Sequence, residues 1–255
     1  TDVRIVNLSL LNTDWYIYQL RDMEPKVPMR MSDGEIDRVM PTRWESKTVS
    51  IKVPKSVAEK YRDEYNSQFN NLNAKLPEEI KFKVDPAMRA QNVGILRTQD
   101  YMILNIIAAN QWKRPIYFAV TVPRSNMVSE LAYFFRMDGL VTKLVPFKNW
   151  EISPDALREN LVEKYQYRGL NDPSVYLNLN IISLLQNYRH AYVQLADYYA
   201  RTNKFDDLKL IMEDMDKNID PDVIPWTNRN VELVTTAFMI KADSTLVDGI
   251  LKDST

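Results

Sequence analysis

The 255-residue chain has no cysteine, one histidine and five glycines. Without cysteine it can form neither a disulfide bond nor a thiolate nucleophile or metal site. The single histidine, His190, excludes a zinc site built from several histidines and a second imidazole for acid–base catalysis. The scattered glycines leave no glycine-rich phosphate loop and no dinucleotide fingerprint. We therefore expect no cofactor and no metal site.

Long apolar runs and surplus charge are absent as well. The chain has 33 Lys and Arg against 34 Asp and Glu, a net charge of −1, which argues against a nucleic-acid partner. No apolar run reaches the roughly 18 residues of a membrane span. Because the sequence begins directly in strand-like residues, we also expect no signal peptide. Since its 45% of apolar residues is typical of a globular protein, we expect a soluble piece of something longer.

Residues 1–150 predict an α/β domain. Val3–Leu11 and Pro115–Val122 are apolar on both faces, as expected for parallel strands that are covered on both sides. Each of these strands is adjacent in the sequence to a predicted helix: residues 15–21 follow the first strand and residues 99–111 precede the second. A third strand is predicted at 140–145.

An inserted lobe is predicted at about residues 46–90. Alternating apolar residues predict half-buried strands at 48–53 and 80–84. Between them, apolar residues at helical spacing from Val57 to Leu72 predict one amphipathic helix.

Residues 151–255 predict an all-α region without a convincing strand. The expected helices span 155–165, 174–187, 188–201, 205–217 and 231–240. Tyr192, Ala196 and Tyr199 fit the first helix of a tetratricopeptide repeat, although Leu208 and Met215 replace small residues of its second helix. The predicted fold is thus an α/β layer with a small, mainly parallel sheet, followed by a tetratricopeptide-like helical region.

Carboxylates are the only plausible acid–base groups, and none of them is assigned a catalytic role. Ligands of open α/β sheets collect at the carboxyl ends of strands, which is where Asn12, Asp14 and Trp15 follow the first strand. Asp14 and Trp15 could bind a sugar, but a helix-capping Asp14 and a core Trp15 are the commoner arrangement.

Three further sets of residues each have a functional and a structural interpretation. Thr98, Gln99 and Asp100 begin the next predicted helix, where capping is again the commoner role. Tyr192 and Tyr199 could line a peptide groove, although tyrosines at helical spacing are more often core residues. For His190, packing on a helix is far commoner than catalysis.

Three segments carry a resemblance to a known family: Asp2–Ile17, Arg97–Val122 and Gly139–Pro146. They resemble the soluble C-terminal region of a polytopic membrane protein family of unknown function. That family is common in Bacteroidetes and is similar to the GT-C-type protein O-mannosyltransferases. The resemblance implies a preceding segment that completes the α/β layer. We therefore expect the first domain to be Rossmann-like and to be truncated in this chain, where it would lack a strand.

The resemblance also implies a function. A transmembrane bundle outside this chain would transfer a sugar from a polyprenyl-phosphate donor to Ser or Thr of an exported protein. This chain would be a non-catalytic domain on the periplasmic side of the inner membrane. Its partner would be the exported acceptor polypeptide or the protein's own transmembrane bundle.

Two other functions remain open from the residues alone. A stand-alone carbohydrate-active enzyme would use Asp14 and Asp100, and it requires both carboxylates in one pocket. A cytoplasmic tetratricopeptide scaffold requires about three helix pairs to be stable.

Overall fold

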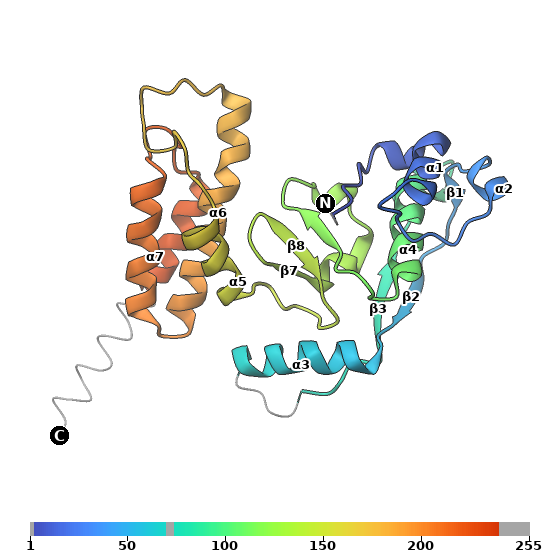
Figure 1. The fold of residues 1–255 in the computed structure, drawn as a ribbon, viewed down its shortest axis with the longest axis horizontal. Helices are drawn as coiled ribbons and strands as arrows, with labels where there is room; N and C mark the ends of the chain where they lie inside the picture. The colour runs from blue at the N-terminus through green and yellow to red at the C-terminus, as the bar shows by residue number, and fades with distance from the viewer. Residues whose placement is uncertain (1–2, 70–73, 240–255) are drawn as a thin grey trace. The chain divides into compact units, whose positions relative to one another are not determined.

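The computed structural model describes residues 3–69 and 74–239 (Figure 1). The chain forms two compact units. Unit 1 comprises Thr1–Phe118, Val122–Phe135 and Lys143–Trp150, and unit 2 comprises Ala119–Thr121, Arg136–Thr142 and Glu151–Thr255. An N-terminal region of small sheets and helices is followed by a helical region, which confirms the two-part fold class predicted from the sequence.

The N-terminal region contains short helices and three small sheets. Its helices are η1 (Leu10–Asn12), α1 (Asp14–Asp22), α2 (Asp33–Ile36), α3 (Lys55–Phe69), α4 (Thr98–Asn110), η2 (Arg124–Asn126) and η3 (Ser129–Phe134). Its strands are β1 (Thr42–Arg43), β2 (Lys47–Lys52), β3 (Glu79–Val84), β4 (Met88–Ala90), β5 (Val93–Leu96), β6 (Tyr117–Ala119), β7 (Phe135–Met137) and β8 (Val141–Leu144). They pair in the orders β1-β5-β4, β2-β3 and β6-β8-β7.

The strand directions correct the expectation of a mainly parallel sheet. β5 pairs antiparallel with β1 and β4, and β2 pairs antiparallel with β3. Strand β8 also runs opposite to β6, because Leu144 donates to Ile116 while Leu140 accepts from Val120. Strands β4 and β5 are joined by a tight turn, in which Gln91 and Asn92 both have positive φ.

The first predicted strand, Val3–Leu11, is not part of a sheet. Residues 3–7 have no regular secondary structure, and Val3 and Ile5 are 73% and 83% exposed. Asn7 explains where this segment ends, since its Oδ1 accepts from the backbone N–H groups of Ser9 and Leu10 at 3.0 and 3.2 Å. This local bond starts the turn into η1, and it competes with strand pairing.

The second run, Pro115–Val122, forms only the three-residue strand β6, at the edge of its sheet. Tyr117 is 46% exposed, so this strand is not covered on both faces as predicted.

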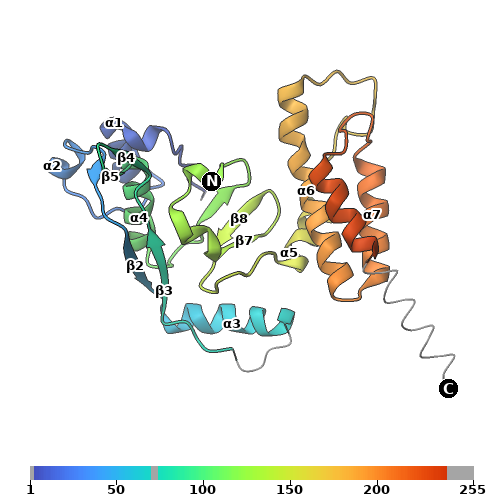
Figure 2. The same ribbon diagram turned by 180° about the vertical axis from the view of Figure 1, so that it is seen from behind.

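The predicted lobe consists of β2, α3 and β3. The register places Ile51 opposite Ile80 and Val49 opposite Phe82, and the apolar side chains of one face enter the core. Figures 1 and 2 show the β2–β3 ribbon running from the region of α4 to α3. There Tyr61 and Tyr65 of α3 pack against the fully buried Trp150.

Unit 2 contains α5 (Pro154–Arg158), the π-helix η4 (Glu159–Lys164), α6 (Leu179–Arg201) and α7 (Phe205–Asn218), and residues 228–239 are also helical. The two helices predicted at 174–187 and 188–201 are one continuous helix that begins later, because Asn178 caps it by accepting from Ile181 N–H. α6 and α7 lie side by side (Figure 2). Residue 240 of the last predicted helix lies outside the described residues, and the tetratricopeptide-like packing stays a prediction.

A buried arginine joins α6 to the segment that follows α7. Arg189 is 0% exposed, and its Nη2 donates to the carbonyls of Ile219 and Ile224 at 3.1 and 2.7 Å. Its guanidinium lies 4.4 Å from the centroid of the Trp226 ring. Burial lowers its pKa, while the charges of Asp216 and Asp220 act in the opposite direction. Carbonyl groups thus take the place of a directly bonded carboxylate.

We expect Arg189→Ala to lower the free energy of unfolding by about 3 kcal/mol, because it leaves a cavity and two unbonded carbonyls. Arg189→Met should lose less, since it retains most of the packing and removes a buried charge. The matched control is Arg201→Ala on the same helix, whose side chain is 62% exposed and which should leave stability nearly unchanged. Urea denaturation followed by tryptophan fluorescence measures all three. Equal stability of Arg189→Ala and Arg201→Ala would contradict this role.

Candidate functional site

The first turn of α4 brings together residues from three parts of unit 1. Asn12, at the end of η1, accepts from the Gln99 backbone N–H at 3.1 Å and donates to the Gln99 side-chain Oε1 at 3.2 Å. Asn12 therefore satisfies an amide that the start of a helix leaves free. Gln99 is only 7% exposed, and its buried Nε2 has no hydrogen-bond partner within the part of the chain that the structure describes.

Next to Gln99, Asp100 forms a bidentate ion pair with Arg97. The guanidinium donates Nε to Oδ2 at 2.8 Å and Nη2 to Oδ1 at 2.9 Å, and Asp100 is 2% exposed. Arg97 also donates to Asn126 Oδ1 at 3.2 Å and to the Ser125 carbonyl at 3.0 Å. The pair therefore fixes the loop around η2 to the start of α4.

This arrangement lines a small cavity, which we call the α4–η2 pocket. Its volume is about 170 Å³. The lining residues are Asp85, Pro86, Ala87, Leu96, Arg97, Asp100, Arg124, Ser125, Met127, Val128 and Ser129. Charged and hydroxyl groups meet apolar side chains in this lining.

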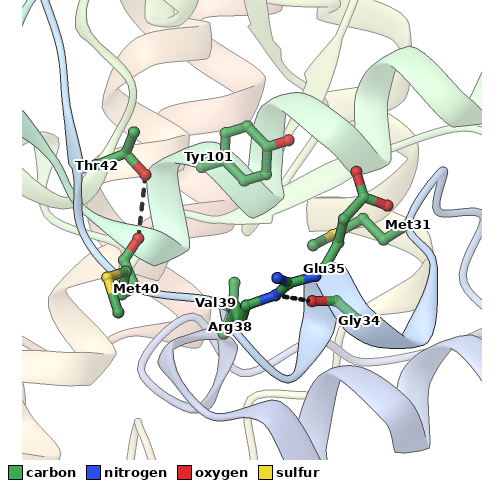
Figure 3. A pocket seen from close by; sticks show the side chains of 8 residues that line it. All are labelled: Met31, Gly34, Glu35, Arg38, Val39, Met40, Thr42 and Tyr101. Atoms are coloured by element: carbon green, nitrogen blue, oxygen red, sulfur yellow. Dashed lines mark hydrogen bonds between the residues drawn. The ribbon is translucent and has the colours of Figure 1, made fainter.

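A second hollow of about 280 Å³, the Met–Tyr pocket, lies on another face of the same helix. Its lining residues are Met31, Gly34, Glu35, Arg38, Val39, Met40, Thr42 and Tyr101 (Figure 3). Arg38 Nε donates to the Gly34 carbonyl at 2.7 Å, and Thr42 Oγ1 donates to the Met40 carbonyl at 3.2 Å. Met40 is 65% exposed and Tyr101 39%, so apolar surface is accessible at this opening.

Asp14 and Trp15 lie at the start of α1 and are both exposed. Asp14 Oδ1 accepts from the Trp15 backbone N–H at 2.7 Å, and the Trp15 ring is 57% exposed. Trp15 is thus not the core residue that commonly occupies such a position. Neither residue lines the two pockets, whereas Asp100 lines the α4–η2 pocket. The structure therefore brings Asn12 and Gln99 together, but it shows no shared pocket for Asp14 and Asp100 among the described residues.

Thr98, the first residue of α4, is buried at 2% exposure and lines neither pocket. It belongs to the packed start of the helix.

The two candidate tyrosines of α6 are buried. Tyr192 is 0% exposed, and its hydroxyl donates to Asp214 Oδ2 at 2.6 Å. Tyr199 is 5% exposed, and burial raises its pKa to about 12. Both residues therefore form core rather than an accessible groove in this structure, while Tyr176 of the same unit is 89% exposed.

His190 is half-buried on α6, and its Nδ1 lies 3.3 Å from Asn230 Oδ1. Burial lowers its pKa. Among the described residues, His, Asp and Glu side chains form no group of three that could hold a metal ion. No helix within the described ranges is long and apolar enough to cross a membrane.

Residues 46–161 match the family model described as TMEM260-associated domain 2. The match covers less than half of the chain, and it suggests a relation to a TMEM260-like membrane protein family. No curated protein and no solved structure matches the chain. All lining residues of the α4–η2 pocket fall within the matched segment.

Sequence reasoning missed three residues of the two pockets. Arg97 precedes Asp100 by three residues, a spacing that allows an ion pair at a helix start, so this partner could have been found. Tyr101 follows Asp100 directly and therefore points to another face of the helix. Arg124 is brought to the pocket by tertiary structure alone, and no local pattern indicates it.

We expect Asp100→Asn to lower the free energy of unfolding by about 2 kcal/mol, because it leaves the Arg97 guanidinium without its anion. The matched control is Asp63→Asn, whose side chain is 74% exposed beside Arg62 and which should have almost no effect. Thermal and urea denaturation measure both variants. An Asp100→Asn protein as stable as the control would show that the ion pair does not hold this turn.

Proposed function

We propose that this chain is a non-catalytic, extracytoplasmic module of a TMEM260-like membrane O-glycosyltransferase and that it binds the exported acceptor polypeptide. The observation that carries the proposal is the match of residues 46–161 to a TMEM260-associated domain. The resemblance to protein O-mannosyltransferases supplies the reaction, which the proposal assigns to a membrane-spanning part of the whole protein.

The Met–Tyr pocket is the surface that we assign to the polypeptide. Methionine side chains adapt their shape to different partners, and exposed tyrosine is enriched in protein interfaces. Tyr101 and Met40 offer such accessible surface, while Glu35 and Arg38 at the same opening can form polar contacts with a peptide. A module that must accept many sequences needs this combination.

If the carboxylates of Asp14 and Asp100 faced one pocket, they would favour the alternative hypothesis of a carbohydrate-active enzyme. Asp100 is instead engaged by Arg97, and Asp14 lines neither pocket. We therefore retain the binding module as the proposed function.

Cysteine labelling tests the location, because the chain has no cysteine of its own. A full-length protein whose other cysteines are replaced would carry Tyr176→Cys, a position that is 89% exposed, or the buried control Ala191→Cys. A membrane-impermeant maleimide should label Tyr176→Cys in cells with an intact inner membrane, and Ala191→Cys only after denaturation. Labelling of Tyr176→Cys only after the inner membrane is disrupted would overturn the extracytoplasmic assignment.

Tyr101→Ala tests the binding surface. The probe is an array of overlapping peptides from exported proteins of the same organism, incubated with the labelled chain. We expect Tyr101→Ala to reduce retention at least fivefold, because the loss of a contacting aromatic ring commonly costs about 1 kcal/mol or more. Tyr133→Ala, a 49% exposed tyrosine of unit 1 outside the pocket, should retain peptides as the unchanged chain does. Equal retention by both variants would contradict the assignment of this surface.

A further inference from the structure

The α4–η2 pocket contains one cation, Arg124, whose side chain forms no ion pair with another described residue. The Asp100 carboxylate forms its ion pair with Arg97. Asp85 accepts from Lys83 Nζ at 2.9 Å and from Ser46 Oγ at 2.5 Å, and these bonds lower its pKa. Arg124 is exposed; its carbonyl accepts from the Met127 N–H at 3.1 Å, whereas its guanidinium has no hydrogen-bond or ion-pair partner within the described residues. The two aspartates and two arginines of the lining balance in formal charge, and Arg124 is the charged group among them whose side chain is left without a partner among the described residues.

Hydroxyl groups accompany this cation. Ser125 and Ser129 line the same cavity. Ser129 Oγ accepts from the Asp85 backbone N–H at 2.9 Å, which leaves the hydroxyl proton free to be donated. A guanidinium beside such donors suits a planar or tetrahedral oxyanion, because its N–H groups form a fork that matches two oxygens.

The cavity also has apolar lining residues. Pro86, Leu96, Met127 and Val128 line it, and Leu96 and Val128 are almost fully buried. Its volume of about 170 Å³ corresponds to the liquid volume of about six water molecules. This exceeds the space needed for an oxyanion group alone, so an organic body of a few carbon atoms also fits.

We infer that the α4–η2 pocket is a binding site for a small organic anion, whose carboxylate or phosphate group pairs with Arg124 and whose carbon body packs against Met127 and Val128. This site is separate from the Met–Tyr pocket and does not depend on the proposed function. Arg97 and Asp100 are positioning residues here, since they hold the loop that carries Arg124 and Ser125.

Titration calorimetry of the full 255-residue chain at constant ionic strength tests the inference with four probes. They are butyrate, n-butyl phosphate, inorganic phosphate and n-butylammonium. We expect saturable one-to-one binding of butyrate, butyl phosphate or both, weaker binding of inorganic phosphate, and none of butylammonium. The comparison of butyrate with butyl phosphate identifies the preferred anionic group.

Two substitutions locate the site. Arg124→Gln should weaken binding of the organic anion at least tenfold, whereas Arg30→Gln, an exposed arginine of unit 1 outside the pocket, should not change it. Met127→Trp should block the apolar half and thereby weaken butyl phosphate more than inorganic phosphate. Thermal denaturation confirms that each variant is folded.

Three results would overturn the inference. The first is the absence of saturable binding by both organic anions. The second is equal binding by Arg124→Gln and Arg30→Gln, and the third is binding of butylammonium as tight as that of butyrate. Inorganic phosphate that binds as tightly as butyl phosphate would overturn the role of Met127 and Val128. Failure of peptide retention by the Met–Tyr pocket leaves every one of these outcomes unaffected.

Discussion

The ion pair between Arg97 and Asp100 holds the first turn of α4, and both pockets of unit 1 are built around this turn. A carboxylate that is 2% exposed is costly to bury unless a cation and hydrogen bonds compensate it. Arg97 does so with two parallel bonds, and it uses its remaining N–H groups on Ser125 and Asn126. One side chain therefore joins the start of α4 to a loop that lies about 28 residues further along the sequence.

Because this turn is held in place, the directions of three successive side chains are set as well. Successive residues of an α-helix point about 100° apart, so Gln99, Asp100 and Tyr101 face different neighbours. Gln99 meets Asn12, Asp100 lines the α4–η2 pocket, and Tyr101 lines the Met–Tyr pocket. Both pockets thus share one helical turn without sharing a lining residue, which is why each can be altered separately.

Local patterns predicted what local forces determine. The apolar stripe from Val57 predicted α3, and alternation predicted β2 and β3, because burial of one face suffices for each. The run from Val3 failed as a strand since pairing depends on a distant partner, and Asn7 supplied a competing local turn. At the site, Asp100 was identified from its position at a helix start, but the tertiary fold alone brings Arg124 beside it.

The two pockets differ in how they relate to the matched domain. Every residue of the α4–η2 pocket lies between residues 46 and 161, whereas the Met–Tyr pocket combines Tyr101 of that segment with residues 31–42 outside it. A protein with only the matched domain could therefore contain the anion site, but it would lack most of the peptide surface. The proposed acceptor specificity consequently belongs to the segment before residue 46, while the matched domain provides the fixed turn against which that segment packs.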